Sequence, residues 1–342
     1  TPVADPYRWL EDTDSAETRA WVEAQNKLTF GFLESIPQRQ LIRQRLTELW
    51  NYPRAWAPLR KGGRYFQLRN SGLQNQDVLY VLDSPDGEPR LLLDPNTLSE
   101  DGTVALHGWA LSENGRYLAY ATSASGSDWQ TWHVRDVDSA QDLPDLVEWS
   151  KFSRAAWKND GTGFFYAAYD RPSQGQEYQG ANYFQKLYFH RLGTSQKADI
   201  LVYERPDQKE WGFSPQVSED GRYLVVEVWV GSDVRNRLFY KDLHNNEPFV
   251  ELISELEAGY NFIGNDGPVF YFRTNLQAPR GRLIAVDIHQ PDQANWRTLI
   301  PEAPDVLEAI KIVKDQFVAI YLHDAYHQMR RFRIDGTPLG EI

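Results

Sequence analysis

Two serines stand in incomplete copies of the Gly-x-Ser-x-Gly pattern, in which a sharp turn exposes a nucleophilic hydroxyl and the glycines leave room around it. Ser195 and Ser214 each follow a glycine by two residues, but a lysine and a glutamine occupy the positions where the second glycine belongs. Both serines lie in strand-rich segments with no helical pattern after them, whereas the nucleophile turn leads from a strand into a helix. We therefore predict that neither serine is a nucleophile.

Two histidines have a spacing that suits a metal site. His323 and His327 are four residues apart, which would place both imidazoles on one face of a helix. They lie in a predicted β-hairpin, where that spacing does not make side chains converge, so we interpret them as turn residues. The sequence has no cysteine and no phosphate-binding glycine loop, and no two carboxylates stand out as an acid and a base. The residues alone predict no catalytic group, no metal and no cofactor.

The composition is typical of a globular protein rich in β-strands. Of 342 residues, 41% are hydrophobic and 13% aromatic, and this aromatic content, with 12 Trp and 18 Tyr, suits half-buried strands. The net charge of −12 would repel a nucleic acid backbone. No apolar run reaches the length of about 18 residues that spans a bilayer, and the first residues do not resemble a signal peptide. We expect a cytoplasmic protein that binds neither nucleic acid nor membrane.

Residues 1–58 have the pattern of two short helices. Asp14 can cap the first helix, with Glu17 completing a capping box, and Pro37 suits the first turn of the second. Tyr52–Pro53 ends the second helix, because the residue before proline avoids helical geometry. Two such helices cannot bury their apolar sides against each other alone, so we expect them to dock on another partner. The apolar residues are Trp21, Val22, Leu28, Phe30, Phe32, Leu33, Leu41, Ile42, Leu46, Leu49 and Trp50.

A repeat of about 50 residues begins near residue 59. Each copy has a predicted hairpin turn, at which glycine, asparagine or aspartate supplies a positive φ. The turns are marked by Gly63, Gly115, Gly161, Gly221, Gly267 and, in a degenerate sixth copy, Asp315. A second signature follows each turn and alternates apolar with polar residues, as a third strand should. Its copies are Leu79–Asp83, Trp132–Asp136, Leu187–Arg191, Leu238–Asp242, Leu283–Asp287 and Met329–Asp335.

This period predicts an all-β fold. Four strands in each repeat of about 50 residues are typical of a β-propeller, so residues 59–342 are expected to form six recognisable blades. The alternative is a β-sandwich with chance glycine turns, which six aligned pairs of signatures make hard to sustain. The third repeat is lengthened by residues 169–184, a polar segment rich in Gly and Gln. Such loops often carry function, although an idle surface insertion is the other interpretation.

Short segments spread from Asp5 to the C-terminus are similar to those of a known family. They are Asp5–Asp12, Trp21–Asn26, Tyr65–Phe66, Asn70–Gln76, Leu93–Asn96, Asp101–Leu106, Ser123–Trp129, Gln185–Tyr188 and Asn236–Leu238. Together they resemble the N-terminal segment and propeller of the prolyl oligopeptidase family of serine peptidases. Because multi-residue matches are distributed so widely, the resemblance is specific.

The resemblance implies a serine endopeptidase that cleaves short peptides after proline. In this family the N-terminal helices pack against an α/β-hydrolase domain, and a seven-bladed propeller covers the active site so that folded proteins are excluded. The catalytic Ser, Asp and His belong to the domain that follows the propeller. We expect that domain and the seventh blade to be missing from these 342 residues, so that the chain should be inactive alone.

The resemblance also implies which residues line the substrate cavity. Phe152 matches an aromatic residue that faces the cavity from the propeller. Trp229 and Ser232 stand where the family places a basic residue and a small thiol-bearing residue, and this sequence departs from the pattern at both positions. Residues 169–184 match a segment associated with substrate gating.

The first hypothesis is therefore the non-catalytic part of a prolyl oligopeptidase, a monomer whose partners are short proline-containing peptides and its own hydrolase domain. The alternative is a stand-alone propeller that binds a peptide or protein. A propeller enzyme working from its central channel is a third possibility, but it would need a cluster of His and acidic residues that the sequence does not suggest.

Overall fold

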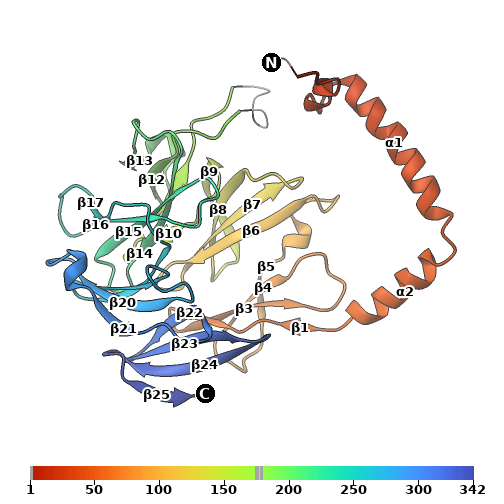
Figure 1. The fold of residues 1–342 in the computed structure, drawn as a ribbon. Helices are drawn as coiled ribbons and strands as arrows, with labels where there is room; N and C mark the ends of the chain where they lie inside the picture. Colours follow the sequence, from red (N-terminus) through yellow and green to blue (C-terminus); the bar gives the residue numbers. More distant parts are fainter. Residues whose placement is uncertain (1–2, 174–176, 178–179) are drawn as a thin grey trace.

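The chain folds into six blades of antiparallel strands, and two helices project away from them (Figure 1). The computed structural model describes residues 3–173, 177 and 180–342. In blades 2 to 6 the strands pair in chain order, and in blade 1 both β1 and β2 pair with β3, which is followed by β4 and β5. This pairing gives the four-stranded meander of a propeller blade. The all-β propeller predicted from the repeat is confirmed.

The blades comprise the following strands. Blade 1 has β1 (Arg54–Ala55), β2 (Leu59–Lys61), β3 (Arg64–Asn70), β4 (Val78–Leu82) and β5 (Arg90–Leu93). Blade 2 has β6 (Val104–Leu111), β7 (Tyr117–Ala124), β8 (Gln130–Asp136) and β9 (Gln141–Ser150), and blade 3 has β10 (Ala156–Trp157), β11 (Gly163–Ala168), β12 (Lys186–Arg191) and β13 (Ile200–Tyr203). Blade 4 has β14 (Trp211–Val217), β15 (Tyr223–Val230), β16 (Arg237–Asp242) and β17 (Val250–Ile253). Blade 5 has β18 (Tyr260–Asp266), β19 (Val269–Thr274), β20 (Arg282–Asp287) and β21 (Arg297–Ile300), and blade 6 has β22 (Val306–Val313), β23 (Gln316–His323), β24 (Tyr326–Arg333) and β25 (Pro338–Glu341).

The repeat signatures occupy equivalent places in the blades. The five marker glycines all have positive φ and lie between the first and second strands, where an L side chain would be strained. In the sixth copy the positive φ belongs to Lys314, not to Asp315, so that marker was misplaced by one residue. The second signatures coincide with the third strands β4, β8, β12, β16, β20 and β24.

Blades 2 and 3 are joined in one eight-stranded sheet. The link is the pairing of Ser150, at the end of β9, with Ala168, at the end of β11. Ser150 Oγ donates a hydrogen bond to the Ala167 carbonyl (2.8 Å) and accepts one from Trp132 Nε1 (3.1 Å). The six repeats therefore appear as five sheets.

The hydrophobic core lies between the blades. Five clusters of buried side chains are present in the described part of the chain, and each joins one blade to the next. Both faces of the inner blades are therefore covered. No cluster of the described residues joins blade 6 to blade 1, so one face of each of these end blades is left open.

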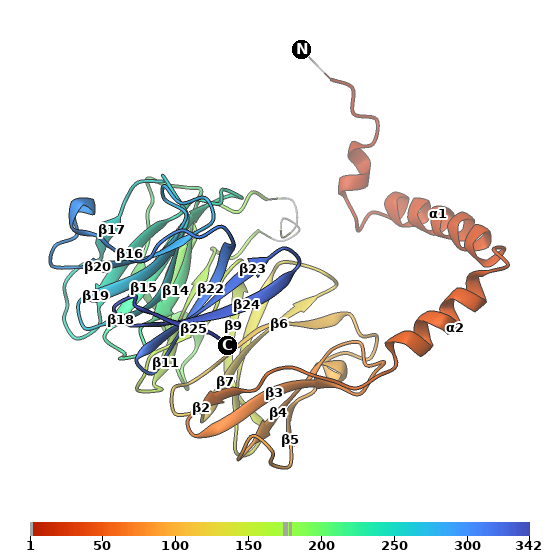
Figure 2. The ribbon, with the colours of Figure 1, turned by 60° about the horizontal axis from the view of Figure 1, so that its bottom comes forward.

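The N-terminal helices lie apart from the blades in both views (Figures 1 and 2). A short 3₁₀ helix (Arg8–Glu11) precedes α1 (Ala16–Glu34) and α2 (Arg39–Trp50). The N-cap of α1 is Ser15, whose side chain accepts from the Thr18 amide, and not Asp14 as predicted. Pro37 lies just before α2 rather than in its first turn.

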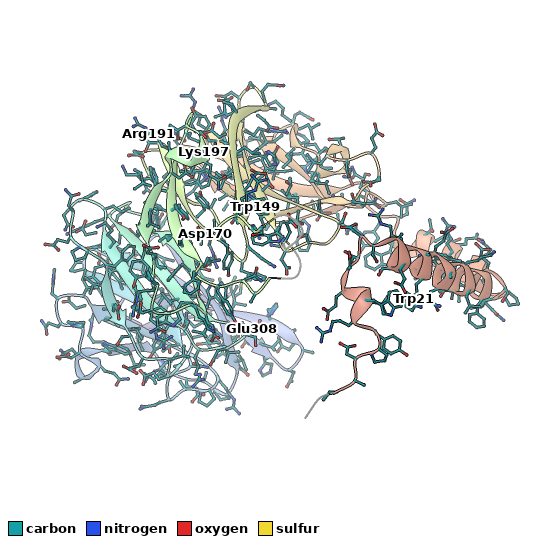
Figure 3. All side chains as sticks on the ribbon, turned by 90° about the horizontal axis from the view of Figure 1, so that it is seen from above. Trp21, Trp149, Asp170, Arg191, Lys197 and Glu308 are labelled. Atoms are coloured by element: carbon teal, nitrogen blue, oxygen red, sulfur yellow. The ribbon has the colours of Figure 1, made fainter. Side chains whose placement is uncertain are left out.

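The apolar sides of both helices are open, as the sequence predicted. Phe32 is 68% exposed and Trp50 57% exposed, although side chains of this kind are normally buried. Trp21 stands on the projecting α1, away from the blades (Figure 3). Among the described residues, no helix is long and apolar enough to cross a membrane.

Candidate functional site

An aromatic cavity lies where blades 3 and 4 meet, at the strand ends opposite the glycine hairpins. Its volume is about 570 Å³. The lining residues are Phe152, Tyr169, Asn182, Tyr183, Glu210, Trp229, Val230 and Gly231. Phe152 and Trp229, expected from the sequence to share a cavity, meet with ring centroids 6.0 Å apart and planes at 87°. Ser232, the third expected residue, is exposed beside Gly231 and does not line the cavity.

Phe152 is held in a strained turn between β9 and β10. Its φ is +55°, a left-handed conformation that costs an aromatic residue on the order of 1–3 kcal/mol unless its surroundings impose it. Two contacts with Ala167 fix the turn: Ser150 Oγ donates to the Ala167 carbonyl, and the Ala167 amide donates to Ser153 Oγ (both 2.8 Å). These bonds hold the backbone of the turn that carries Phe152, whose side chain is 46% exposed.

Gln185 ties the same turn to the neighbouring blade. Its Nε2 donates to the Lys151 carbonyl (2.7 Å), and its Oε1 accepts from the Phe213 amide (2.6 Å). Gln185 is only 2% exposed, so both bonds are protected from water. Blades 3 and 4 thus hold the Phe152 turn from two sides.

Trp229 owes its position to a glycine. Gly212 on β14 is paired with Trp229 on β15, and the indole lies directly over it. A Cβ added at Gly212 would be 1.9 Å from Trp229 Cζ2. The glycine is needed here for close approach rather than for its backbone freedom.

A second aromatic group extends the site and was missed from the sequence. Trp129 packs edge-on against Trp149 and Tyr169, with centroids 5.6 and 6.0 Å away. Lys151 Nζ lies 4.9 Å from the Trp129 ring and 5.2 Å from the Phe152 ring, within the range of cation–π attraction. Burial raises the pKa of Tyr169 to about 12, so its hydroxyl stays protonated at neutral pH. The sequence signal was the density of aromatic residues around the third repeat.

Part of the expected gating segment reaches the cavity. Within residues 169–184, Tyr169, Asn182 and Tyr183 supply cavity wall, and the Phe184 amide donates to the Lys209 carbonyl (2.8 Å). Lys209 Nζ lies 4.6 Å from the Tyr183 ring. Residues 174–176 and 178–179 lie outside the described residues.

The serines weighed as nucleophiles have structural contacts. Ser195 caps a 3₁₀ helix (Gln196–Ala198), where its side chain accepts from the Lys197 amide. Ser214 lies within β14 and pairs with Glu227 of β15. Neither is at the strained strand-to-helix turn that nucleophilic serines of hydrolases occupy.

The two spaced histidines contact different carboxylates. His323 Nδ1 is 2.7 Å from Asp305 Oδ1, and His327 Nε2 is 2.7 Å from Glu308 Oε2. They lie on β23 and β24, and the turn between these strands contains Asp324 at φ +50°. They are therefore strand residues with separate partners, which corrects their interpretation as turn residues.

A buried ionic cluster was also missed. His190 of β12 lies between Asp145 and Asp199, and all three side chains are at most 2% exposed. The sequence offered no signal for it, because the three residues are as far as 54 positions apart and meet only when blades 2 and 3 pack. The three residues are not part of the lining of the aromatic cavity.

A larger cavity of about 740 Å³, with both polar and apolar lining, lies at the hairpin end of the blades. Lys61 of blade 1 pairs with Glu113 of blade 2 at its edge, and Asn159 Nδ2 donates to the Glu219 carbonyl between blades 3 and 4 (2.8 Å). The two cavities therefore lie at opposite ends of the blades: an ion pair and a hydrogen bond between blades border the larger one, and the paired rings of Phe152 and Trp229 border the other.

Comparisons with known proteins agree with this fold. A family model described as "Prolyl oligopeptidase, N-terminal beta-propeller domain" matches residues 1–340. The chain is 36% identical over 342 residues to a prolyl endopeptidase of Elizabethkingia meningoseptica, covering 100% of this chain and 48% of that protein. It is 31% identical over 371 residues to the dual function macrocyclase-peptidase POPB of Galerina marginata, covering 100% of this chain and 50% of that protein. The chain thus spans about half the length of these relatives.

Solved structures give the same result. Prolyl oligopeptidase B from Galerina marginata, bound to a 35mer hydrolysis and macrocyclization substrate, matches 100% of this chain and 50% of its own, with a TM-score of 0.89 and 29% identity. A structure from an analysis of two prolyl endopeptidases matches 99% of this chain and 49% of its own, with a TM-score of 0.78 and 35% identity. Since the family model covers residues 1–340 and the blades have the expected topology, this chain belongs to the prolyl oligopeptidase family, of which it forms the N-terminal β-propeller domain.

Proposed function

We propose that this chain is the non-catalytic half of a prolyl endopeptidase, a serine peptidase that cleaves short peptides after proline. The observation that carries the proposal is the family match over residues 1–340, in which the chain spans about half of each peptidase relative. The catalytic Ser, Asp and His then reside in an α/β-hydrolase domain outside these 342 residues. The chain alone is inactive and needs no cofactor.

The open helices support docking on that hydrolase domain. Residues 1–58 form the docking segment and residues 59–342 the propeller in this proposal. Exposed aromatic and aliphatic side chains on α1 and α2 would lose their contact with water on docking, which stabilises an interface by about 25 cal/mol per Å² of apolar surface. Without such a partner, nothing explains why α1 and α2 expose apolar side chains to water.

The aromatic cavity is proposed as the propeller wall of the peptide-binding space. Phe152 and Trp229 present ring faces and edges to the cavity, which suit the apolar ring of proline. Ser232 would lie at its rim. A cavity of about 570 Å³ has the size of a small-ligand site, so it admits a few residues of an extended peptide and excludes a folded protein. The propeller then acts as a size filter, and residues 169–184 as part of the gate.

The open faces of blades 1 and 6 support a seventh blade. Val318, Ile320 and Leu322 of β23 point to the face that no cluster of the described residues covers. A further blade packed there would bury them as blades 2 to 5 bury the equivalent positions. A cytoplasmic location and a monomeric state complete the proposal, in keeping with a cysteine-free sequence.

Activity measurements on two forms of the protein test the proposal. The 342-residue chain should not hydrolyse a Gly-Pro-linked chromogenic peptide, whereas the same chain joined to a prolyl endopeptidase hydrolase domain should do so. In the joined protein, Phe152→Ala should raise KM about tenfold and change kcat less, because the cavity wall binds substrate without touching the reacting atoms. Leu201→Ala, on an exposed outer strand, is the matched control.

Two outcomes would overturn the proposal. Hydrolysis by the 342-residue chain that survived repurification would show that a nucleophile is present. A native protein with the 39.6 kDa mass of this chain would favour the alternative, a stand-alone propeller that binds a peptide or protein through the aromatic cavity.

A further inference from the structure

A buried ionic cluster connects blades 2 and 3 through one histidine. His190 Nε2 is 3.0 Å from Asp145 Oδ1, and His190 Nδ1 is 2.8 Å from Asp199 Oδ1. The imidazole is 0% exposed, and the two carboxylates are 1% and 2% exposed. Two carboxylates on one imidazole in a water-free space form an arrangement that the family match does not explain.

The hydrogen bonds of the carboxylates indicate the charge of this cluster. Tyr166 Oη donates to Asp199 Oδ2 (2.7 Å), and the Gly193 amide donates to Asp145 Oδ1 (2.6 Å). Each carboxylate therefore accepts from a donor outside His190 as well as facing one of its ring nitrogens. Each ring nitrogen of His190 thus faces a carboxylate oxygen, and an imidazolium, which donates from both nitrogens, satisfies this arrangement.

The electrostatic environment agrees with this geometry. Burial lowers the pKa of His190, but the hydrogen bonds and negative charges of Asp199 and Asp145 outweigh it and raise the pKa above its ordinary value. Tyr166, which donates to Asp199, and Tyr188, which stacks on Tyr166, have pKa values raised by burial, so both stay neutral.

The cluster fastens the edge of one blade to the next. Asp145 lies on β9, the last strand of blade 2, whereas His190 and Asp199 belong to blade 3. Gln196, also of blade 3, makes a second attachment to β9: its Nε2 donates to the Glu148 carbonyl (2.9 Å), and its Oε1 accepts from the Glu148 amide (3.0 Å). The outer edge of β9 is thus held by side chains of blade 3.

Strand β9 leads directly into the aromatic cavity. It ends at Ser150, two residues before Phe152, and Trp149 of the same strand lies in the second aromatic group. Trp149 has φ +61° and Phe152 has φ +55°, so the chain passes through two strained residues within four positions. A strained segment keeps its conformation only where its anchors are firm.

We propose that His190, as a doubly hydrogen-bonded imidazolium, is a latch between blades 2 and 3 and a positioning residue for the aromatic cavity. It fixes β9, whose end carries Trp149 and the Phe152 turn. The latch holds while the ring is charged. Because the pKa of His190 is raised in the folded chain, its contribution is complete below the unfolded value of about 6.5 and is lost as the pH rises through the raised value.

Amide hydrogen exchange on the 342-residue chain tests the latch without any hydrolysis, so its result is independent of the proposed peptidase function. In His190→Gln, amides of residues 145–153 should exchange about tenfold faster at pH 7, and those of blade 5 should be unchanged. In the parent chain, corrected for intrinsic rates, protection of residues 145–153 should fall with rising pH, and in the variant it should not. His133→Gln is the matched control, since His133 lies on the adjacent β8 and contacts Thr122 instead of the latch.

Two further readouts concern the ring and the cavity. Nitrogen NMR of His190 should show two protonated ring nitrogens at pH 7, and 4-fluorophenylalanine at position 152 should change its fluorine shift in His190→Gln but not in His133→Gln. The proposal is overturned if only one ring nitrogen of His190 is protonated at pH 7, or if the fluorine shift at position 152 is the same in His190→Gln as in the parent chain. It is also overturned if amide exchange of residues 145–153 is unchanged in His190→Gln, or if exchange accelerates equally in all blades.

Discussion

The second strands of an inner blade and of an end blade are both apolar at successive positions, but their surroundings differ. In blade 3, all six residues of β11 are buried, since blades 2 and 4 cover its two faces. In blade 6, β23 is also apolar at six successive positions, but only Phe317, Ala319 and Tyr321 are buried, against blade 5. A strand that is apolar on both faces is typical of a sheet covered on both sides. The open face of β23 is therefore the place where the proposed seventh blade would pack.

The largest expected effect comes from removing an inner-blade side chain. Phe164 and Phe165 are adjacent on β11 and belong to different core clusters. Phe164→Ala and Phe165→Ala should each lower the free energy of unfolding by about 3–5 kcal/mol, because each leaves a cavity in a packed interface. Denaturant unfolding of the two variants checks this. An effect at only one of the two positions would break the claim that both faces of β11 are equally covered.

A smaller effect is expected where a glycine admits an aromatic ring. Gly212→Ala should lower the free energy of unfolding by about 1–3 kcal/mol and displace the Trp229 indole, since the new Cβ has no room. Unfolding experiments measure the first effect and tryptophan fluorescence the second. Gly108→Ala on β6 is the control, because nothing lies within 4 Å of its added Cβ. Equal results for the two variants would contradict the close packing of Trp229.

On the open face of blade 6, truncation should cost little. Val318→Ala should lower the free energy of unfolding by less than about 1 kcal/mol, since the side chain is only half-buried, whereas Phe317→Ala beside it should cost about 3–5 kcal/mol. The same denaturant titrations measure both. A large effect of Val318→Ala would mean that the face is already covered in solution, for example by a second molecule.

The smallest effect concerns His323 of blade 6, whose side chain is 41% exposed. The hydrogen bond and charge of Asp305 raise the pKa of His323, so the pair stabilises the fold below the ordinary imidazole pKa of about 6.5 and loses this contribution as the pH rises through the raised value. His323→Gln should make the denaturation midpoint less dependent on pH over that interval. His289→Gln, which removes an exposed histidine of blade 5, is the control. If His323→Gln changed the pH dependence of the denaturation midpoint more than His190→Gln does, the contrast between the partly exposed His323–Asp305 pair and the buried His190 cluster would be contradicted.

The sequence by itself determined the period and the strand order. Glycine turns recur because hairpins need positive φ, and the third-strand signatures recur because each blade repeats the same strand at the same place. The same local rules account for two wrong predictions. Ser15 caps α1 although Asp14 is an equally good capping residue, and Lys314 has the positive φ that was expected of Asp315. Such choices depend on one or two residues of register, which short patterns do not resolve.

Only the tertiary structure decided the site. Phe152 and Trp229 were named from a family resemblance, but their contact depends on Gly212, Ser153 and Gln185, which come from three segments. The residues of the His190 cluster meet only when blades 2 and 3 pack together. The open face of β23 exists because no described blade packs against that side of blade 6. Local sequence specifies strands and turns because those obey backbone geometry. Contacts between blades join residues that are far apart in the sequence, so no short segment specifies them.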